Sequence, residues 1–286
     1  MKPEISPLIG LTLFCTMFAL GLSLEPRALQ RLVRSPAMPI RVILGSCLLV
    51  PLVGLLLLNL PLSWSIPQPE RTALALMAIC PSAPLALRKA RKSGGDHQLA
   101  ALIQIIAALI AIATVPVMAY AYRETFNMSG WEVRPADIAM QVGRAQVLPV
   151  LIGLCVRQWR NNLAEWLEKP LDRLANTLLV VLAGIIVIKA GPLLATSLMG
   201  QAETLVLMAL LVIASLAIGW VLSSEKSDQR VTTSLVTAMR NPGLALMLAN
   251  QYGQEMISLK PAILNYVLTT LLVSWPVVRR ARSVHS

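Results

Sequence analysis

Nine apolar segments follow one another along the chain, each close to the 17 to 25 residues that a helix needs to cross a hydrocarbon core of roughly 30 Å. Only 14% of the 286 residues are charged and the mean hydropathy is +0.68, a balance typical of bilayer-embedded chains. The segments are joined by short connections, so we expect one all-helical transmembrane unit over residues 1–286, without a soluble domain. The predicted spans are residues 6–24, 40–60, 71–88, 98–122, 137–157, 174–198, 203–223, 231–251 and 259–278.

The basic residues predict the orientation of the chain. With the N-terminus outside, 17 of the 25 Lys and Arg residues fall on the cytoplasmic side or its edge and five fall outside. Cytoplasmic loops are the ones enriched in Lys and Arg, so we expect the N-terminus outside and the C-terminus in the cytoplasm, in a bacterial inner (plasma) membrane. The net charge of +11 then orients the protein in the lipid bilayer and indicates no nucleic acid partner. The remaining three cations, Arg144, Lys189 and Arg240, fall inside predicted spans.

Several other classes of protein are disfavoured by the sequence. The first span lacks the basic start of a signal peptide and is followed by Glu25-Pro26-Arg27, so we expect it to be retained. The four cysteines lie within spans and show no paired spacing, which predicts neither a disulfide framework nor a metal site. We find no nucleophile and base constellation and no phosphate-binding glycine loop, and therefore expect no enzyme and no cofactor.

Two predicted spans contain helix-breaking sequences at their centres. The third carries Cys80-Pro81-Ser82-Ala83-Pro84, and the eighth carries Arg240-Asn241-Pro242-Gly243. Proline inside a helix frees backbone groups that the bilayer cannot satisfy. Interrupted helices in matching positions of two halves are typical of secondary transporters built from inverted repeats, which bind substrate near the breaks. The alternative is that the prolines only kink two packed helices.

Four short motifs carry a resemblance to a known family. They are Met17-Phe18-Ala19-Leu20-Gly21-Leu22-Ser23-Leu24 followed by Pro26, Leu57-Leu58-Asn59-Leu60-Pro61, Cys80-Pro81 with Gly95-Asp96 downstream, and Arg240-Asn241-Pro242-Gly243-Leu244-Ala245. In order and spacing they resemble the bile acid:sodium symporter family. The resemblance implies nine or ten helices, inverted repeats and two crossing discontinuous helices. It also implies a core domain (about 40–122 and 203–279) and a panel domain (about 6–24 and 137–198).

The chain departs from the family where sodium is bound. Aligning the motifs puts residues without the usual ligands at the sodium-site positions, namely Ser46, Ala86, Leu87, Ala100 and Val236, with Gln104 and Arg240 at two more. Sodium needs oxygen ligands, so its binding becomes doubtful. We expect the Arg240 guanidinium to stand in for the ion as a fixed positive charge. The alternative is that Arg240 pairs with a structural acidic residue.

A buried cation beside a helix break favours an anionic substrate. The residues expected to line its site are Arg240, Asn241, Pro242, Gly243, Pro81, Ser82, Arg88, Gln104, Asn265 and Lys189. Arg144 could also face the substrate cleft, but its long stem favours snorkelling toward an interface.

The resulting hypothesis is a secondary transporter of a small organic anion, working by an elevator or rocking motion. Without sodium, transport is passive, exchange-type or coupled otherwise, with Asp96 and His97 as one candidate proton relay. Two alternatives stay open. One is arsenite or metalloid efflux through the Cys80 thiol, and the other is a non-transporting receptor of the same fold. The sequence leaves the oligomeric state open.

Overall fold

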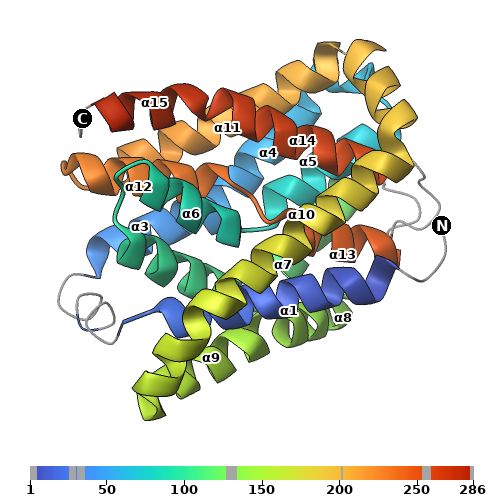
Figure 1. Cartoon of the computed structure of the whole chain (residues 1–286). Coiled ribbons are helices and arrows are strands. Elements are labelled where there is room, and N and C mark those ends of the chain that lie inside the picture. The colour runs from blue at the N-terminus through green and yellow to red at the C-terminus, as the bar shows by residue number, and fades with distance from the viewer. Residues whose placement is uncertain are drawn as a thin grey trace.

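The computed structural model describes residues 5–25, 30, 36–126, 134–200, 202–252 and 259–283. Within these ranges the chain is helical apart from short connections and one isolated β-bridge (Figure 1). The first half contains α1 (Ile5–Ser23), α3 (Ala37–Leu44), η1 (Gly45–Leu49), α4 (Val50–Asn59), η2 (Pro61–Trp64), α5 (Gln68–Ile79), α6 (Pro84–Lys92) and α7 (His97–Phe126). The second half contains α8 (Pro135–Val142), η3 (Gly143–Val147), α9 (Leu148–Trp159), α10 (Asn161–Gly200), α11 (Ala202–Val221), α12 (Ser227–Ala238), α13 (Pro242–Tyr252), α14 (Leu259–Val273) and α15 (Trp275–Ser283).

Five helical stretches are long and apolar enough to cross a bilayer. They are Ala37–Asn59, His97–Phe126, Pro135–Trp159, Ala202–Val221 and Leu259–Arg279, and a shorter apolar helix covers Pro7–Ser23. The protein is therefore an all-helical integral membrane protein, as the sequence predicts. The predicted spans at 71–88 and 231–251 are each divided between two helices, and the full set of nine spans stays a prediction.

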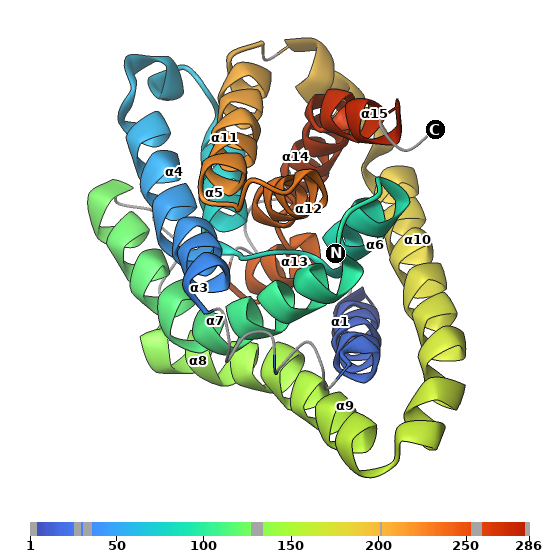
Figure 2. The same ribbon diagram turned by 90° about the vertical axis from the view of Figure 1, so that its left-hand side faces the viewer.

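On one side of the molecule, α1 packs against α9 and α10 (Figures 1 and 2). Gly21 of α1 faces Gly153 of α9, where a Cβ added to Gly21 would lie 3.0 Å from the Gly153 Cα atom and would overlap the carbonyl oxygen of Val150. Small residues let two membrane helices approach until their backbones touch. Any side chain at this crossing would push α1 away from α9.

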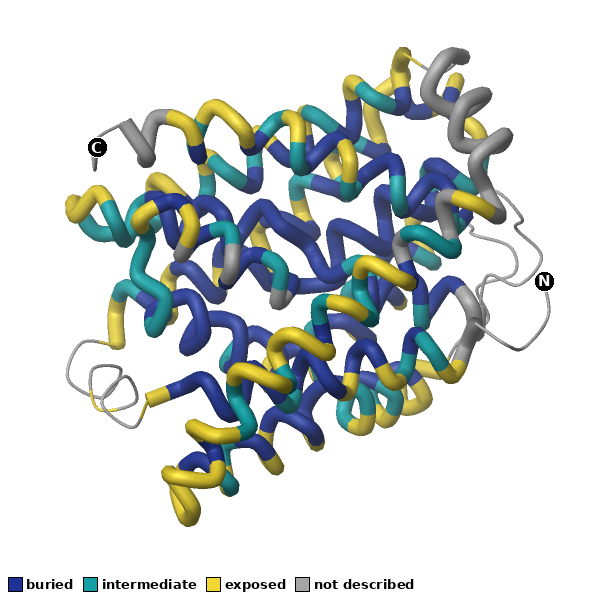
Figure 3. The backbone as a smooth tube through the Cα atoms, in the orientation of Figure 1, coloured by how far each residue is buried: buried dark blue, intermediate teal, exposed yellow. Residues whose placement is uncertain are grey.

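The two divided helices lie at the centre of the bundle, in the dark blue region of Figure 3. Residues 72–79 of α5 and 231–238 of α12 are all buried. Helix α5 packs against α4 and α14, and α12 packs against α7 and α11. Because apolar and small side chains surround the divided helices, the backbone groups freed at the divisions must find partners inside the protein.

Two spans contain a π-helical turn that the sequence reading did not foresee. In η1 the N–H of Val50 donates to the carbonyl of Gly45, and in η3 the N–H of Leu148 donates to the carbonyl of Gly143. Each turn ends just before a proline, Pro51 or Pro149. A proline ring clashes with the carbonyl four residues earlier, and the wider turn relieves that clash. The turn η1 carries Ser46 and the turn η3 carries Arg144.

Candidate functional site

The two divided helices meet at their breaks. Residues 80–83 separate α5 from α6, and residues 239–241 separate α12 from α13. Ser82 and Arg240 form an antiparallel β-bridge, in which the N–H of Ala83 donates to the carbonyl of Met239 (2.8 Å) and the N–H of Asn241 donates to that of Pro81 (2.9 Å). The segments are extended because residues preceding proline avoid the helical conformation. The predicted site residues Pro81, Ser82, Pro242 and Gly243 thus lie at the breaks.

Arg240 occupies this crossing and is 2% exposed. Its Nε donates to the carbonyl of Met77 (3.1 Å), its Nη2 to that of Ala78 (2.6 Å), and its Nη1 to that of Thr237 (3.3 Å). Nη1 also donates to the Ser46 Oγ atom at 2.9 Å. The guanidinium is therefore held by neutral oxygens at the C-terminal ends of α5 and α12, where the helix dipoles are negative.

These three carbonyls have lost their helical partners. In a continuous helix Met77 would accept from residue 81, but Pro81 has no N–H. Ala78 would accept from Ser82, which lies beyond the end of α5. Thr237 would accept from Asn241, whose N–H donates to Pro81 instead. The guanidinium supplies the three missing donors, which explains how a permanent charge is tolerated at the centre of the protein.

Arg240 has no carboxylate partner within the part of the chain that the structure describes, where the recorded ion pair joins Arg157 and Glu168 (3.6 Å). The expected alternative, a structural acidic residue paired with Arg240, therefore finds no support there. The four hydrogen bonds occupy four of the five guanidinium N–H donors, so direct contact with a substrate would use the remaining donor or require the side chain to leave some of its present acceptors. The expectation that Arg240 binds the substrate itself stays a prediction.

Asn241 begins the second half-helix. Its Oδ1 accepts from the N–H of Leu244 (3.1 Å), which makes it the N-cap of α13. Its buried Nδ2 has no partner among the described residues. The N-terminal ends of α6 and α13 both begin at the crossing, so their positive dipole ends adjoin the breaks.

The positions aligned with sodium ligands fall into two groups. Ser46 contacts Arg240 directly. Ala86, Leu87, Ala100 and Val236 are buried together in one apolar cluster with neighbours such as Met17 and Leu235.

The remaining predicted site residues are distributed more widely. Gln104 of α7 is 3% exposed, and both of its amide atoms are without partners among the described residues. Asn265 is fully buried in α14. The side chains of Arg88 and Lys189 lie outside the described part of the structure. In the candidate proton relay, Asp96 Oδ1 accepts from the N–H of Leu99 (2.9 Å), the geometry of a helix cap for α7.

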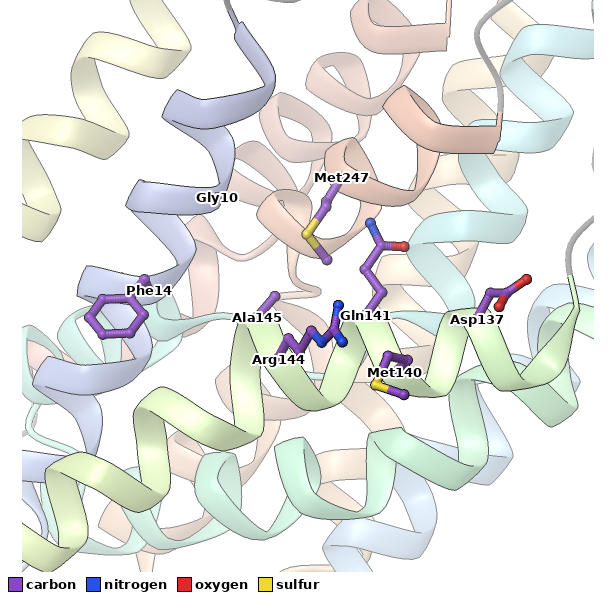
Figure 4. Close-up of a pocket in the computed structure, with 8 residues that line it drawn as sticks. All are labelled: Gly10, Phe14, Asp137, Met140, Gln141, Arg144, Ala145 and Met247. Atoms are coloured by element: carbon purple, nitrogen blue, oxygen red, sulfur yellow. The ribbon is translucent and has the colours of Figure 1, made fainter.

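A cavity of about 480 Å³ lies beside the crossing and was not anticipated from the sequence. It opens between α1, α8 with η3, and α13 (Figure 4). Its lining residues are Gly10, Phe14, Asp137, Met140, Gln141, Arg144, Ala145 and Met247. Arg144, for which the sequence leaves both the substrate cleft and snorkelling open, lines this cavity. The sequence feature that could have indicated this cavity is an arginine inside a predicted span, since charged residues there usually face a cavity.

Comparison with known families identifies the chain. A family model described as Sodium Bile acid symporter family matches residues 10–201, more than half of the sequence. A search of curated proteins found no match. The matched region includes α1 and the first break, whereas the second break with Arg240 lies beyond it. The chain belongs to the sodium bile acid symporter family.

Proposed function

We propose that the protein transports a small organic anion across the membrane without sodium, and that Arg240 acts as a built-in cation. Family membership makes it a membrane transporter of the bile acid symporter kind. The observation that carries the finer proposal is the position of the Arg240 guanidinium, which donates to Met77, Ala78, Thr237 and Ser46 at the helix breaks. Carbonyls at such breaks are the groups that coordinate sodium in discontinuous-helix transporters.

A second observation supports loss of the ion. The aligned positions Ala86, Leu87, Ala100 and Val236 offer no oxygen side chain and pack in hydrocarbon. A hard cation without oxygen ligands is not retained. One sodium position is thus replaced by apolar packing and the other by a guanidinium. Because the guanidinium cannot dissociate, transport is then passive, by exchange, or coupled to another solute.

The proposal extends to the architecture implied by the family. The crossing forms a core together with α3, η1, α4, α7, α11 and α14, while α1, α8, α9 and α10 form a panel against which the core moves. Nine spans with the N-terminus outside and the C-terminus in the cytoplasm of a bacterial inner membrane agree with the distribution of basic residues. Substrate reaches the N-terminal ends of α6 and α13, where the helix dipoles favour an anion.

Uptake into proteoliposomes tests the proposal. Purified protein is reconstituted, and the flux of a panel of labelled carboxylates is compared in sodium chloride and in choline chloride at equal ionic strength. We expect carboxylate flux that is the same in both salts. Thermal unfolding in detergent provides an independent readout, since any ligand that binds only the folded state raises its stability. Selective stabilisation by sodium, together with sodium-dependent flux, would refute the proposal and show that the protein is a sodium-coupled symporter.

The same assay addresses the two alternatives. A metalloid carrier would move arsenite, but a neutral metalloid gains nothing from Arg240, and the Cys80 thiol is fully buried. A receptor of the same fold would bind carboxylates without moving them. We expect carboxylate flux and no arsenite flux.

A further inference from the structure

The 480 Å³ cavity is lined by Arg144, whose guanidinium has no partner among the described residues. Among the described residues nothing forms a hydrogen bond or an ion pair with the Arg144 guanidinium, in contrast to Arg240. Figure 4 shows the guanidinium of Arg144 and the amide of Gln141 within the cavity, below Met247 of α13. The cavity therefore offers a charged donor group without an internal acceptor.

The depth of Arg144 in the membrane makes this arrangement costly without a ligand. Arg144 is nine residues beyond the start of the span Pro135–Trp159, or about 14 Å along the helix axis. That is close to the middle of a hydrocarbon core roughly 30 Å thick. Charged residues at such depth face water-filled cavities and mark the paths of substrates or ions.

A second charge lies at the other end of the cavity. Asp137, Gln141 and Arg144 are spaced four and three residues apart, so they share one face of the helix. Asp137 and Arg144 are about 10 Å apart along the axis, and no ion pair joins them. Between them, Gln141 has a buried Oε1 atom without a partner among the described residues, which would accept from a donor on the ligand.

The remaining lining is apolar. Phe14 of α1, Met140 of α8 and Met247 of α13 also line the cavity, with Met247 above Arg144 and Phe14 on the side of Arg144 away from Asp137 (Figure 4). Methionine and phenylalanine contact aliphatic chains without strict shape requirements. The volume is within the range of about 300 to 1,000 Å³ found for small-molecule sites.

We propose that this cavity selects molecules with a single carboxylate, with Arg144 binding that carboxylate and Asp137 repelling a second acidic group at the far end of the same molecule. The inference rests on the proposed function, which it deepens by naming the substrate class. The preferred ligand is a monocarboxylate with a short apolar chain, and a hydroxyl or ammonium group toward Asp137 strengthens binding. A dicarboxylate of equal length places its second charge near Asp137, where like charges about 6 Å apart lower affinity at least about threefold.

Calorimetric titration in a neutral detergent tests this with four six-carbon probes: hexanoate, 6-hydroxyhexanoate, 6-aminohexanoate and hexanedioate. We expect hexanoate to bind at least about threefold more tightly than hexanedioate, and the two substituted probes to bind more tightly than hexanoate. Asp137→Asn, an isosteric change, removes the discrimination, so that the ratio of the hexanoate and hexanedioate affinities falls to about one. Arg144→Gln lowers hexanoate affinity about tenfold or more, and Arg144→Lys recovers part of it.

The outcomes separate this inference from the proposed function. Equal binding of hexanoate to the native protein and to Arg144→Gln would overturn the cavity assignment and leave sodium-free transport standing. Selective binding without flux in proteoliposomes would overturn transport and leave the cavity standing. Unchanged discrimination in Asp137→Asn would refute the role of that carboxylate. Displacement of hexanoate by phosphatidylglycerol vesicles would assign the cavity to a lipid headgroup and overturn the proposal.

Discussion

Replacing Arg240 by methionine tests whether the guanidinium holds the helix crossing together. Methionine keeps an unbranched side chain of similar length but removes the donors to Met77, Ala78, Thr237 and Ser46. Hydrogen bonds from charged groups contribute about 1.5 kcal/mol each at the lower end of their range, so four are worth about 6 kcal/mol. Removing a charge from the membrane interior recovers about 3 kcal/mol. The difference, about 3 kcal/mol, is the expected net loss of stability. It reflects the three carbonyls that remain buried without donors.

Thermal unfolding in detergent measures this loss. About 3 kcal/mol corresponds to a fall in Tm of roughly 5 to 10 °C for a chain of this size. Ser46→Ala removes one bond, worth about 1.5 kcal/mol, and keeps the charge, so it should lower Tm by about half of that amount. Arg240→Lys keeps the charge without the planar fork of donors and should fall between the two. A Tm of the Arg240→Met variant equal to or above that of the native protein would refute the idea that the guanidinium replaces the missing helical donors.

Three further perturbations probe the surroundings of the crossing. Gly21→Ala should lower Tm or prevent α1 from packing on α9, because the added methyl overlaps the Val150 carbonyl. As the control, Gly184→Ala should leave Tm unchanged, because there is open space around that position. Asn241→Ala should cost about 1 kcal/mol through loss of the α13 cap, and Asn241→Asp should restore that stability; equal loss in both variants would contradict the capping role. Burial raises the pKa of the Glu168 carboxyl, which lies outside the predicted spans. The stability that this carboxyl contributes is therefore fully present below the ordinary glutamate pKa and is lost as pH rises through the higher pKa of the folded protein. Glu168→Gln should flatten that part of the profile of stability against pH, measured by thermal unfolding.

Composition and the spacing of prolines were sufficient to predict the membrane class, the helical fold and the positions of the two breaks. These features are local, since a proline removes its own N–H wherever it stands. The prediction that Arg240 sits in a polar hollow also followed from the cost of its charge in a membrane. Pro81 was a more specific indication of a buried acceptor, because its missing N–H leaves the Met77 carbonyl without a helical donor.

What the sequence could not provide was the pairing of distant residues. Met77 and Arg240 are 163 positions apart, and the bond between them depends on how the two breaks cross. The sequence left the position of Arg144 open for a similar reason: snorkelling and cavity lining need the same long side chain, and lining the cavity depends on the packing of α1 and α13 around it. The π-helical turns at η1 and η3 depend on a single extra residue per turn, which apolar periodicity does not resolve.

A cation that is part of the polypeptide changes the electrical balance of each transport cycle. In an ion-coupled carrier, sodium enters with the anion and cancels or exceeds its charge, so a negative membrane potential assists uptake. In the sodium-free transport that we propose, Arg240 stays bonded to the ends of α5 and α12, so the substrate alone contributes the net charge moved. A potential of 100 mV then opposes entry of a monoanion by about 2.3 kcal/mol. Under this proposal, uptake needs exchange for another anion, coupling to another solute, or an inward substrate gradient that exceeds this energy, and the potential otherwise favours release of the substrate from the cell.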